Sequence, residues 1–191
     1  MEILKQRILK EAKLLPGQII KVDAFLNHQI DVELLDQMGQ VFYERFKHAQ
    51  VDRILTIEAS GIALAVSAAH YFKVPVVFAK KAQLNISNEH YYLSQIKSYT
   101  KKVDSIISVS KDYLKENEHI LIIDDFLAHG QAICGLLSLV TQAHALCVGV
   151  GIAIEKGFQD GGKSLRAQGI PLESLAIIEV MDDAHIEFRP E

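Results

Sequence analysis

Short apolar runs alternate with amphipathic segments along most of this chain. Largely apolar runs of about four to eight residues, bounded by small or polar residues, are typical of strands buried in a parallel sheet. Such runs occur at residues 53–57, 74–79, 103–109, 120–123, 147–154 and 174–180. Their alternation with helical segments predicts an α/β fold with a mainly parallel, five-stranded sheet flanked by helices, in a single domain that spans residues 1–191.

Helical patterns fill the intervals between these runs. The clearest one spans Val32–Phe46, where Leu34 and Met38 return on one face and Asp31 precedes the first turn as a cap. Further helices are predicted at residues 2–15, 61–72, 133–140 and 162–168. We expect these helices to cover the two faces of the sheet.

Two segments depart from the alternation. Residues 16–28 begin with the turn pair Pro16-Gly17, and we expect them to form a small hood together with C-terminal residues. Residues 80–102 are polar and rich in Ser, Asn, Gln and Tyr. A long polar segment between two strands predicts a flexible lid that closes over a site, with a plain surface hairpin as the alternative.

The stretch ILIIDDFLAHGQA, residues 120–132, carries the strongest chemical signal. Asp124 and Asp125 follow an apolar run and precede a helix, which places them at the carboxyl end of a strand, where α/β sheets bind ligands. Carboxylates accept hydrogen bonds from vicinal hydroxyls, and a small-residue turn leaves backbone N–H groups free to bind an anion. The turn comprises Ala128, His129, Gly130, Gln131 and Ala132. These features predict a site for a sugar diol beside a phosphate.

This stretch resembles the phosphoribosyl pyrophosphate (PRPP) signature of the type I phosphoribosyltransferases. The resemblance implies that Asp124 and Asp125 are catalytic and hold the ribose hydroxyls, while the turn binds the phosphate. Many members of the family carry Thr or Ser where this chain has His129 and Ala132. The phosphate would therefore depend more on backbone amides and on the Gln131 side chain. The alternative for His129 is an exposed turn residue without a binding role.

A second strand–loop–helix unit lies upstream. Its loop contains Glu58, Ala59, Ser60 and Gly61. In this order before the acidic signature, it resembles the pyrophosphate-binding loop of the same family. Lys81 follows the next predicted strand, and the resemblance implies that its charge contacts pyrophosphate oxygens. An ordinary solvated pair, Lys80-Lys81, is the alternative.

Lys156 and Phe158 close the strand that follows the signature helix. In purine-specific members of the family, a lysine here donates to an exocyclic carbonyl of the base and an aromatic ring stacks on it. The other end of the base would be bound by Ile20 and Asn27 in the hood. The resemblance covers residues 1–188 and is strongest to the xanthine-specific members, which implies xanthine and PRPP as substrates.

The implied reaction is a purine salvage step that converts xanthine and PRPP to xanthosine 5′-monophosphate and pyrophosphate. The resemblance further implies Mg²⁺, held mainly by substrate oxygens and with no protein ligand that can be named, and a homodimer. Sister enzymes that use guanine, hypoxanthine or adenine remain alternatives. So does a regulator that binds PRPP without chemistry.

Composition restricts the partners and the compartment. A net charge of −4 gives no electrostatic footprint for nucleic acid. No apolar run approaches the roughly 18 residues of a membrane span, and residues 1–14 lack the apolar core of a signal peptide. Cys134 and Cys147 lie in apolar periodic segments, so we expect reduced core cysteines of a cytoplasmic protein.

One motif points elsewhere. Residues 157–164, GFQDGGKS, satisfy the P-loop pattern of nucleotide hydrolases. In those proteins the P-loop normally precedes the acidic strand, whereas here it follows, and only 27 residues remain after Ser164. We therefore reject an ATPase.

Overall fold

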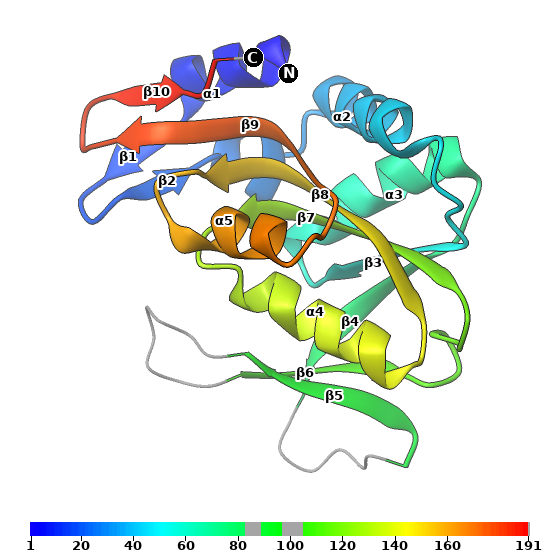
Figure 1. Cartoon of the computed structure of the whole chain (residues 1–191). Coiled ribbons are helices and arrows are strands. Elements are labelled where there is room, and N and C mark those ends of the chain that lie inside the picture. The colour runs from blue at the N-terminus through cyan, green and yellow to red at the C-terminus, as the bar shows by residue number, and fades with distance from the viewer. Residues whose placement is uncertain (83–88, 97–104, 191) are drawn as a thin grey trace.

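A computed structural model describes residues 1–82, 89–96 and 105–190 of the protein. An eight-stranded sheet crosses this described part in the order β10-β9-β8-β7-β3-β4-β6-β5 (Figure 1). The strands are β3 (Arg53–Ile57), β4 (Val76–Ala82), β5 (Tyr91–Ile96), β6 (Ser105–Ser110), β7 (His119–Leu127), β8 (Leu146–Lys156), β9 (Leu172–Met181) and β10 (Ile186–Phe188).

Five of these strands, β9, β8, β7, β3 and β4, run parallel to one another. The predicted α/β class and the parallel core are therefore confirmed. The sheet is wider than the predicted five strands because antiparallel strands extend both edges, β10 beside β9 at one edge and β6 and β5 beyond β4 at the other.

Helices cover both faces of the sheet. They are α1 (Glu2–Glu11), α2 (Val32–Phe46), α3 (Ser60–Phe72), α4 (Gln131–Gln142) and α5 (Asp160–Ala167). Apolar side chains of α1, α2 and α3 share one buried cluster, whereas those of α4 and α5 belong to a second cluster on the other face. The prediction for α2 is confirmed, and Leu34 N donates to the Asp31 carboxylate at 3.1 Å as the expected cap.

The predicted first helix is too long, because α1 ends at Glu11 and a two-stranded hairpin follows. Its strands are β1 (Lys13–Leu15) and β2 (Ile19–Lys21), which pair antiparallel around the turn at Gly17 and Gln18. A short π-helix, η1 (Asp23–Asn27), leads into α2. The hairpin, η1 and β10 lie at the same end of the molecule in Figure 1, where the predicted hood of residues 16–28 and C-terminal residues would lie.

The predicted lid, residues 80–102, is described only in part. Lys80 and Lys81 belong to β4, and Tyr91–Ile96 forms β5, which pairs with β6. The hairpin alternative therefore fits this described portion. Residues 83–88 and 97–104 lie outside the described residues, so closure of a lid stays a prediction.

Candidate functional site

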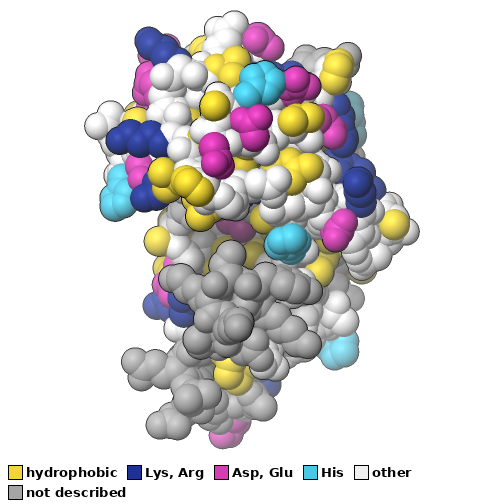
Figure 2. Space-filling view, turned by 90° about the vertical axis from the view of Figure 1, so that its left-hand side faces the viewer, with side chains coloured by type: hydrophobic (Ala, Val, Ile, Leu, Met, Phe, Trp, Pro, Cys, Tyr) yellow, Lys and Arg dark blue, Asp and Glu magenta, His cyan; other side chains and the backbone are white. Residues whose placement is uncertain are grey.

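The carboxyl ends of the parallel strands meet at one edge of the sheet, on the left in Figure 1. This edge of the central strands is where open α/β sheets bind ligands. Figure 2 looks onto the same side, with the hood at the top, and shows acidic and basic side chains interspersed on the part described.

The two acids lie in the last part of β7, which extends to Leu127 rather than ending at Ile123 as predicted. Asp124 is 3 % exposed and Asp125 is 8 % exposed. Burial, followed by the charge of Asp125, raises the pKa of Asp124 well above its usual range. A group in such surroundings gains most from a ligand that offers hydrogen bonds to its charged form.

Gly61 brings the upstream loop against this acid. A Cβ atom at Gly61 would lie 2.6 Å from Asp124 Oδ1 and 2.1 Å from Thr56 Oγ1, so only glycine fits there. Thr56 is fully buried near the end of β3, which is the neighbour of β7 in the sheet. The upstream loop and the acidic end of β7 therefore meet where α3 begins.

The turn after β7 reaches the N-terminus of α4. Gly130 has a φ of +79° and precedes the first helical residue, Gln131, so the predicted helix starts two residues earlier than expected. The first N–H groups of a helix have no partner within it, so this end offers amide donors to an anion. His129 is exposed, whereas Gln131 and Ala132 are half-buried.

The same turn rests on the backbone of α5. Gly161 N donates to Ala128 O at 3.1 Å, and a Cβ at Gly161 would lie 2.4 Å from that oxygen and 2.7 Å from Gly130 N. Gly162 is equally constrained, because its Cβ would lie 2.0 Å from Glu155 Oε1. The glycines of the P-loop-like pattern are thus explained by packing, and Lys163 and Ser164 lie inside α5 rather than in a phosphate loop.

The upstream loop is tied to β4. The Glu58 carboxylate accepts a hydrogen bond from Lys81 N at 2.7 Å, and Glu58 N donates to Ala79 O at 3.0 Å. Ala59 precedes the first residue of α3, Ser60. The Glu58 side chain therefore holds the loop beside the end of β4, where the exposed Lys81 side chain is available to a ligand.

Lys156 connects the sheet edge with the hood. Its ammonium donates to Gln18 O in the β1–β2 turn at 2.8 Å, and burial lowers its pKa. Ile20 and Phe158 belong to one apolar cluster, in which Ile20 is buried and Phe158 half-buried. Asn27 is exposed at the end of η1. Lys156 thus links the end of β8 directly to the hairpin that carries Ile20.

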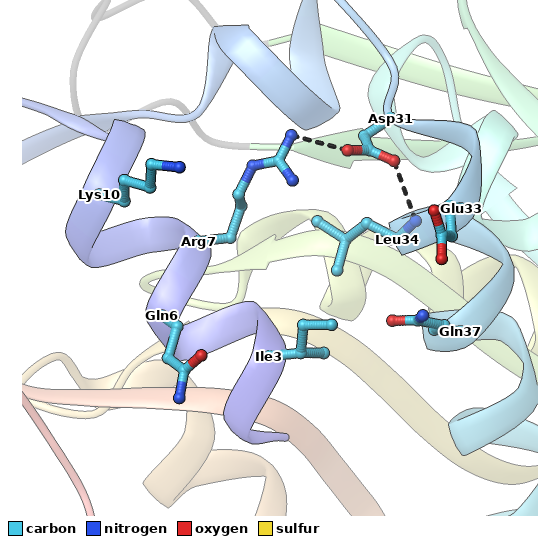
Figure 3. Close-up of a pocket in the computed structure, with 8 residues that line it drawn as sticks. All are labelled: Ile3, Gln6, Arg7, Lys10, Asp31, Glu33, Leu34 and Gln37. Carbon is cyan, nitrogen blue, oxygen red and sulfur yellow. Dashed lines mark hydrogen bonds and ion pairs between the residues drawn. The ribbon is translucent and has the colours of Figure 1, made fainter.

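Arg7 of α1 reaches Asp31 at the start of α2 (Figure 3). In a groove of about 280 Å³ between α1 and α2, its guanidinium donates to the Asp31 carboxylate at 2.6 Å. Arg7 also pairs with Glu11 at 3.0 Å and lies 5.7 Å from the centre of the Phe25 ring. Because Asp31 caps α2 and Phe25 belongs to η1, one side chain joins α1, η1 and α2.

Comparison with known proteins identifies the family of the chain. A family model for the phosphoribosyl transferase domain matches residues 27–166, which include both loops and the paired acids. The chain belongs to the phosphoribosyltransferase family. The resemblance read from the signature strand is therefore confirmed.

Curated phosphoribosyltransferases resemble the chain over nearly its whole length. It is 55 % identical to the xanthine phosphoribosyltransferase of Laribacter hongkongensis, covering 98 % of this chain and 100 % of that protein. It is 52 % identical to the xanthine phosphoribosyltransferase of Ruminiclostridium cellulolyticum, covering 98 % and 99 %. Among solved structures, the adenine phosphoribosyltransferase of Leishmania tarentolae superposes with a TM-score of 0.77 at 19 % identity, over 95 % of this chain and 90 % of that one, which supports the fold.

In this phosphoribosyltransferase, Arg7→Met should raise KM for the base while KM for PRPP stays unchanged. The substitution keeps the aliphatic stem but removes the guanidinium that lies over the Phe25 ring of the hood and pairs with Asp31 just after it. Since both partners are partly exposed, the expected increase is about two- to threefold. Steady-state kinetics with each substrate varied in turn measures it. Lys47→Met, which breaks the exposed pair with Glu44 on α2, is the matched control. An equal change in both KM values would contradict a role through the hood.

Several features of the phosphoribosyltransferase site escaped the sequence analysis. Thr56 and Gly161 were not assigned roles. For Thr56, a hydroxyl between apolar strand residues is a signal that could have been used.

The prediction for Cys134 was wrong, because Cys134 lies exposed on α4 while the neighbouring Ile133 and Leu136 face the core. Cys147 is half-buried, and burial raises its thiol pKa. Within the described residues, no helix is long and apolar enough to cross a membrane.

Proposed function

We propose that this phosphoribosyltransferase transfers the phosphoribosyl group of PRPP to xanthine, forming xanthosine 5′-monophosphate and pyrophosphate in cytoplasmic purine salvage. The observation that supports it from the geometry is the position of Lys156, whose half-buried ammonium donates to Gln18 O in the hood. An ammonium can only donate, so it suits the carbonyl oxygens of an oxopurine. The choice of xanthine is supported by the names of the relatives that are 49–55 % identical.

The proposed chemistry follows from charge. A ring nitrogen of xanthine forms a bond to C1 of PRPP as the bond from C1 to pyrophosphate breaks, and the nitrogen loses its proton. Positive charge develops on the ribose in an oxocarbenium-like transition state. In this proposal the carboxylates of Asp124 and Asp125 bind the ribose hydroxyls and stabilise that charge. Lys81 and the amides at Ala59–Gly61 stabilise the departing pyrophosphate.

The 5-phosphate is assigned to the turn at residues 128–132, whose amides open the α4 helix. Of these groups, Gln131 adds a side-chain donor and His129 is exposed beside them. The turn is held by backbone contacts to α5, so its donors are positioned before the ligand arrives. Such preorganisation saves ordering entropy on binding.

Mg²⁺ is the proposed cofactor. No group of three or more candidate metal-binding side chains lies together in the described ranges 1–82, 89–96 and 105–190. Mg²⁺ commonly keeps water and binds through substrate phosphates with one or two carboxylates, so the site fits an ion held mainly by PRPP oxygens. When bound, the ion would neutralise charge on pyrophosphate. A homodimer, expected from the resemblance, likewise stays a proposal.

Product formation from each base tests the proposal. The purified protein is incubated with PRPP, Mg²⁺ and xanthine, guanine, hypoxanthine or adenine, and each nucleotide is quantified by chromatography. We expect xanthosine 5′-monophosphate to form with the highest kcat/KM. A higher value with guanine or hypoxanthine would show a sister enzyme. Protection of the protein by PRPP against thermal unfolding, without any nucleotide product, would show a PRPP-binding regulator.

A further inference from the structure

Two buried polar atoms face each other at the start of α3 without hydrogen-bond partners. They are the hydroxyl oxygen of Thr56 and the Oδ1 atom of Asp124. Thr56 is fully buried, and Asp124 is 3 % exposed. A buried polar group without a partner costs about 1–3 kcal/mol, so its presence calls for an explanation.

Both atoms lie against the same small space beside Gly61. A Cβ placed there would be 2.1 Å from Thr56 Oγ1 and 2.6 Å from Asp124 Oδ1. Both oxygens therefore lie on the side of Gly61 where any other residue would carry its Cβ atom, and close to one another. The absence of a side chain at position 61 allows the hydroxyl and the carboxyl group to approach each other directly.

The Asp124 carboxylate needs a hydrogen-bond donor when it is charged. Burial and the neighbouring Asp125 raise its pKa, so the empty site disfavours the carboxylate. The proposed reaction requires the opposite, because a carboxylate stabilises a cationic ribose and a neutral acid does not. A hydroxyl that donates to Oδ1 would favour the charged form and leave the other oxygen for the ribose.

We propose that Thr56 is a positioning residue that donates its hydroxyl hydrogen to Asp124 Oδ1 when PRPP occupies the site. The inference rests on the proposed function in assigning Asp124 to the ribose of PRPP. It explains why an unpaired hydroxyl lies between the apolar residues Leu55 and Ile57 of the strand RILTI. The empty protein bears the cost of an unmade hydrogen bond, and the bond forms in the complex.

Thr56→Val separates this role from packing, because valine has the same shape without the hydroxyl. Removing an unpaired buried hydroxyl should leave the melting temperature of the empty protein unchanged or higher. The same variant should lower kcat about tenfold, the value of one hydrogen bond to a charged group, and reduce the thermal shift caused by PRPP. KM for xanthine should not change. Thr56→Ser, which keeps the donor, should restore most of both losses.

Thr141→Val is the matched control, since that residue is exposed at the end of α4. Thr56→Ala serves as a second hydroxyl-free variant if Thr56→Val does not fold, with the same losses expected. Wild-type kcat and a wild-type PRPP shift in the folded hydroxyl-free variant would overturn the proposal. A Thr56→Ser variant as impaired as Thr56→Val would also overturn the proposal.

Failure of the proposed function gives a different result from failure of the inference about Thr56. If the unmodified protein makes no nucleotide from xanthine but is stabilised by PRPP, the proposed reaction fails. The dependence of that PRPP shift on the Thr56 hydroxyl then still decides the inference. A shift lost with Thr56→Val and kept with Thr56→Ser supports it, and a shift equal in both refutes it.

Discussion

Asp124→Asn and Asp125→Asn are each expected to lower kcat at least about a hundredfold, with a smaller rise in KM for PRPP. Asparagine has nearly the same shape and still accepts a hydrogen bond, so part of the ground-state binding to the ribose hydroxyls survives. The negative charge that stabilises the oxocarbenium-like transition state is lost. An effect on kcat larger than that on KM is the signature of a group that acts mainly in the transition state.

Initial rates at saturating xanthine, with PRPP varied, measure both constants. Asp112→Asn is the matched control, because Asp112 is an exposed residue after β6 and should keep wild-type kinetics. Thermal unfolding of each variant tests whether the fold is intact. An unchanged kcat in both variants would contradict the catalytic assignment of the two acids.

Lys156→Ala should raise KM for xanthine by about ten- to a hundredfold, because a desolvated charged donor is removed from the base. The Lys156 ammonium is already half-buried and held by Gln18 O, so little reorganisation is needed before the base binds. The affinity for PRPP should stay nearly unchanged. In the unmodified protein, adenine should be poorer than xanthine by at least about tenfold, since its amino group would meet the ammonium donor to donor.

Lys163→Ala is the control, because Lys163 is an exposed lysine on α5 and also the lysine of the P-loop-like pattern. Kinetics with xanthine and adenine at fixed PRPP give the comparison. Wild-type constants for Lys163→Ala would also exclude a phosphate-binding role for that pattern. If adenine proves the best substrate, the role of Lys156 is wrong.

Local signals were sufficient for much of the fold. The α2 helix was predicted with its bounds because an apolar stripe and a capping aspartate, Asp31, act within a few residues. The β3 strand was likewise predicted from a short apolar run. The β5 strand was missed because it is polar, half-exposed and defined by its pairing with β6. The hairpin after α1 was also missed, because its strand β1 has only three residues, too few for an apolar pattern to show.

The candidate site could be predicted where acidic, basic or small residues lie at the ends of apolar strands. Asp124, Gly61 and Lys156 were found because each follows or ends an apolar run, and parallel strands place such ends on one edge. The contacts between segments could not be predicted, because they depend on packing between residues far apart in the chain. Arg7 with Asp31 and Gly161 with Ala128 are examples.

The contact of Gly161 with the 128–130 backbone has a consequence for engineering. With a Cβ at position 161 only 2.4 Å from Ala128 O, the turn and the start of α5 must change together. Transplanting residues 128–132 from another member of the family is compatible with this chain only if the new backbone also clears α5. A designer who wishes to alter the turn proposed to bind phosphate therefore has to exchange two segments about 30 residues apart as one module.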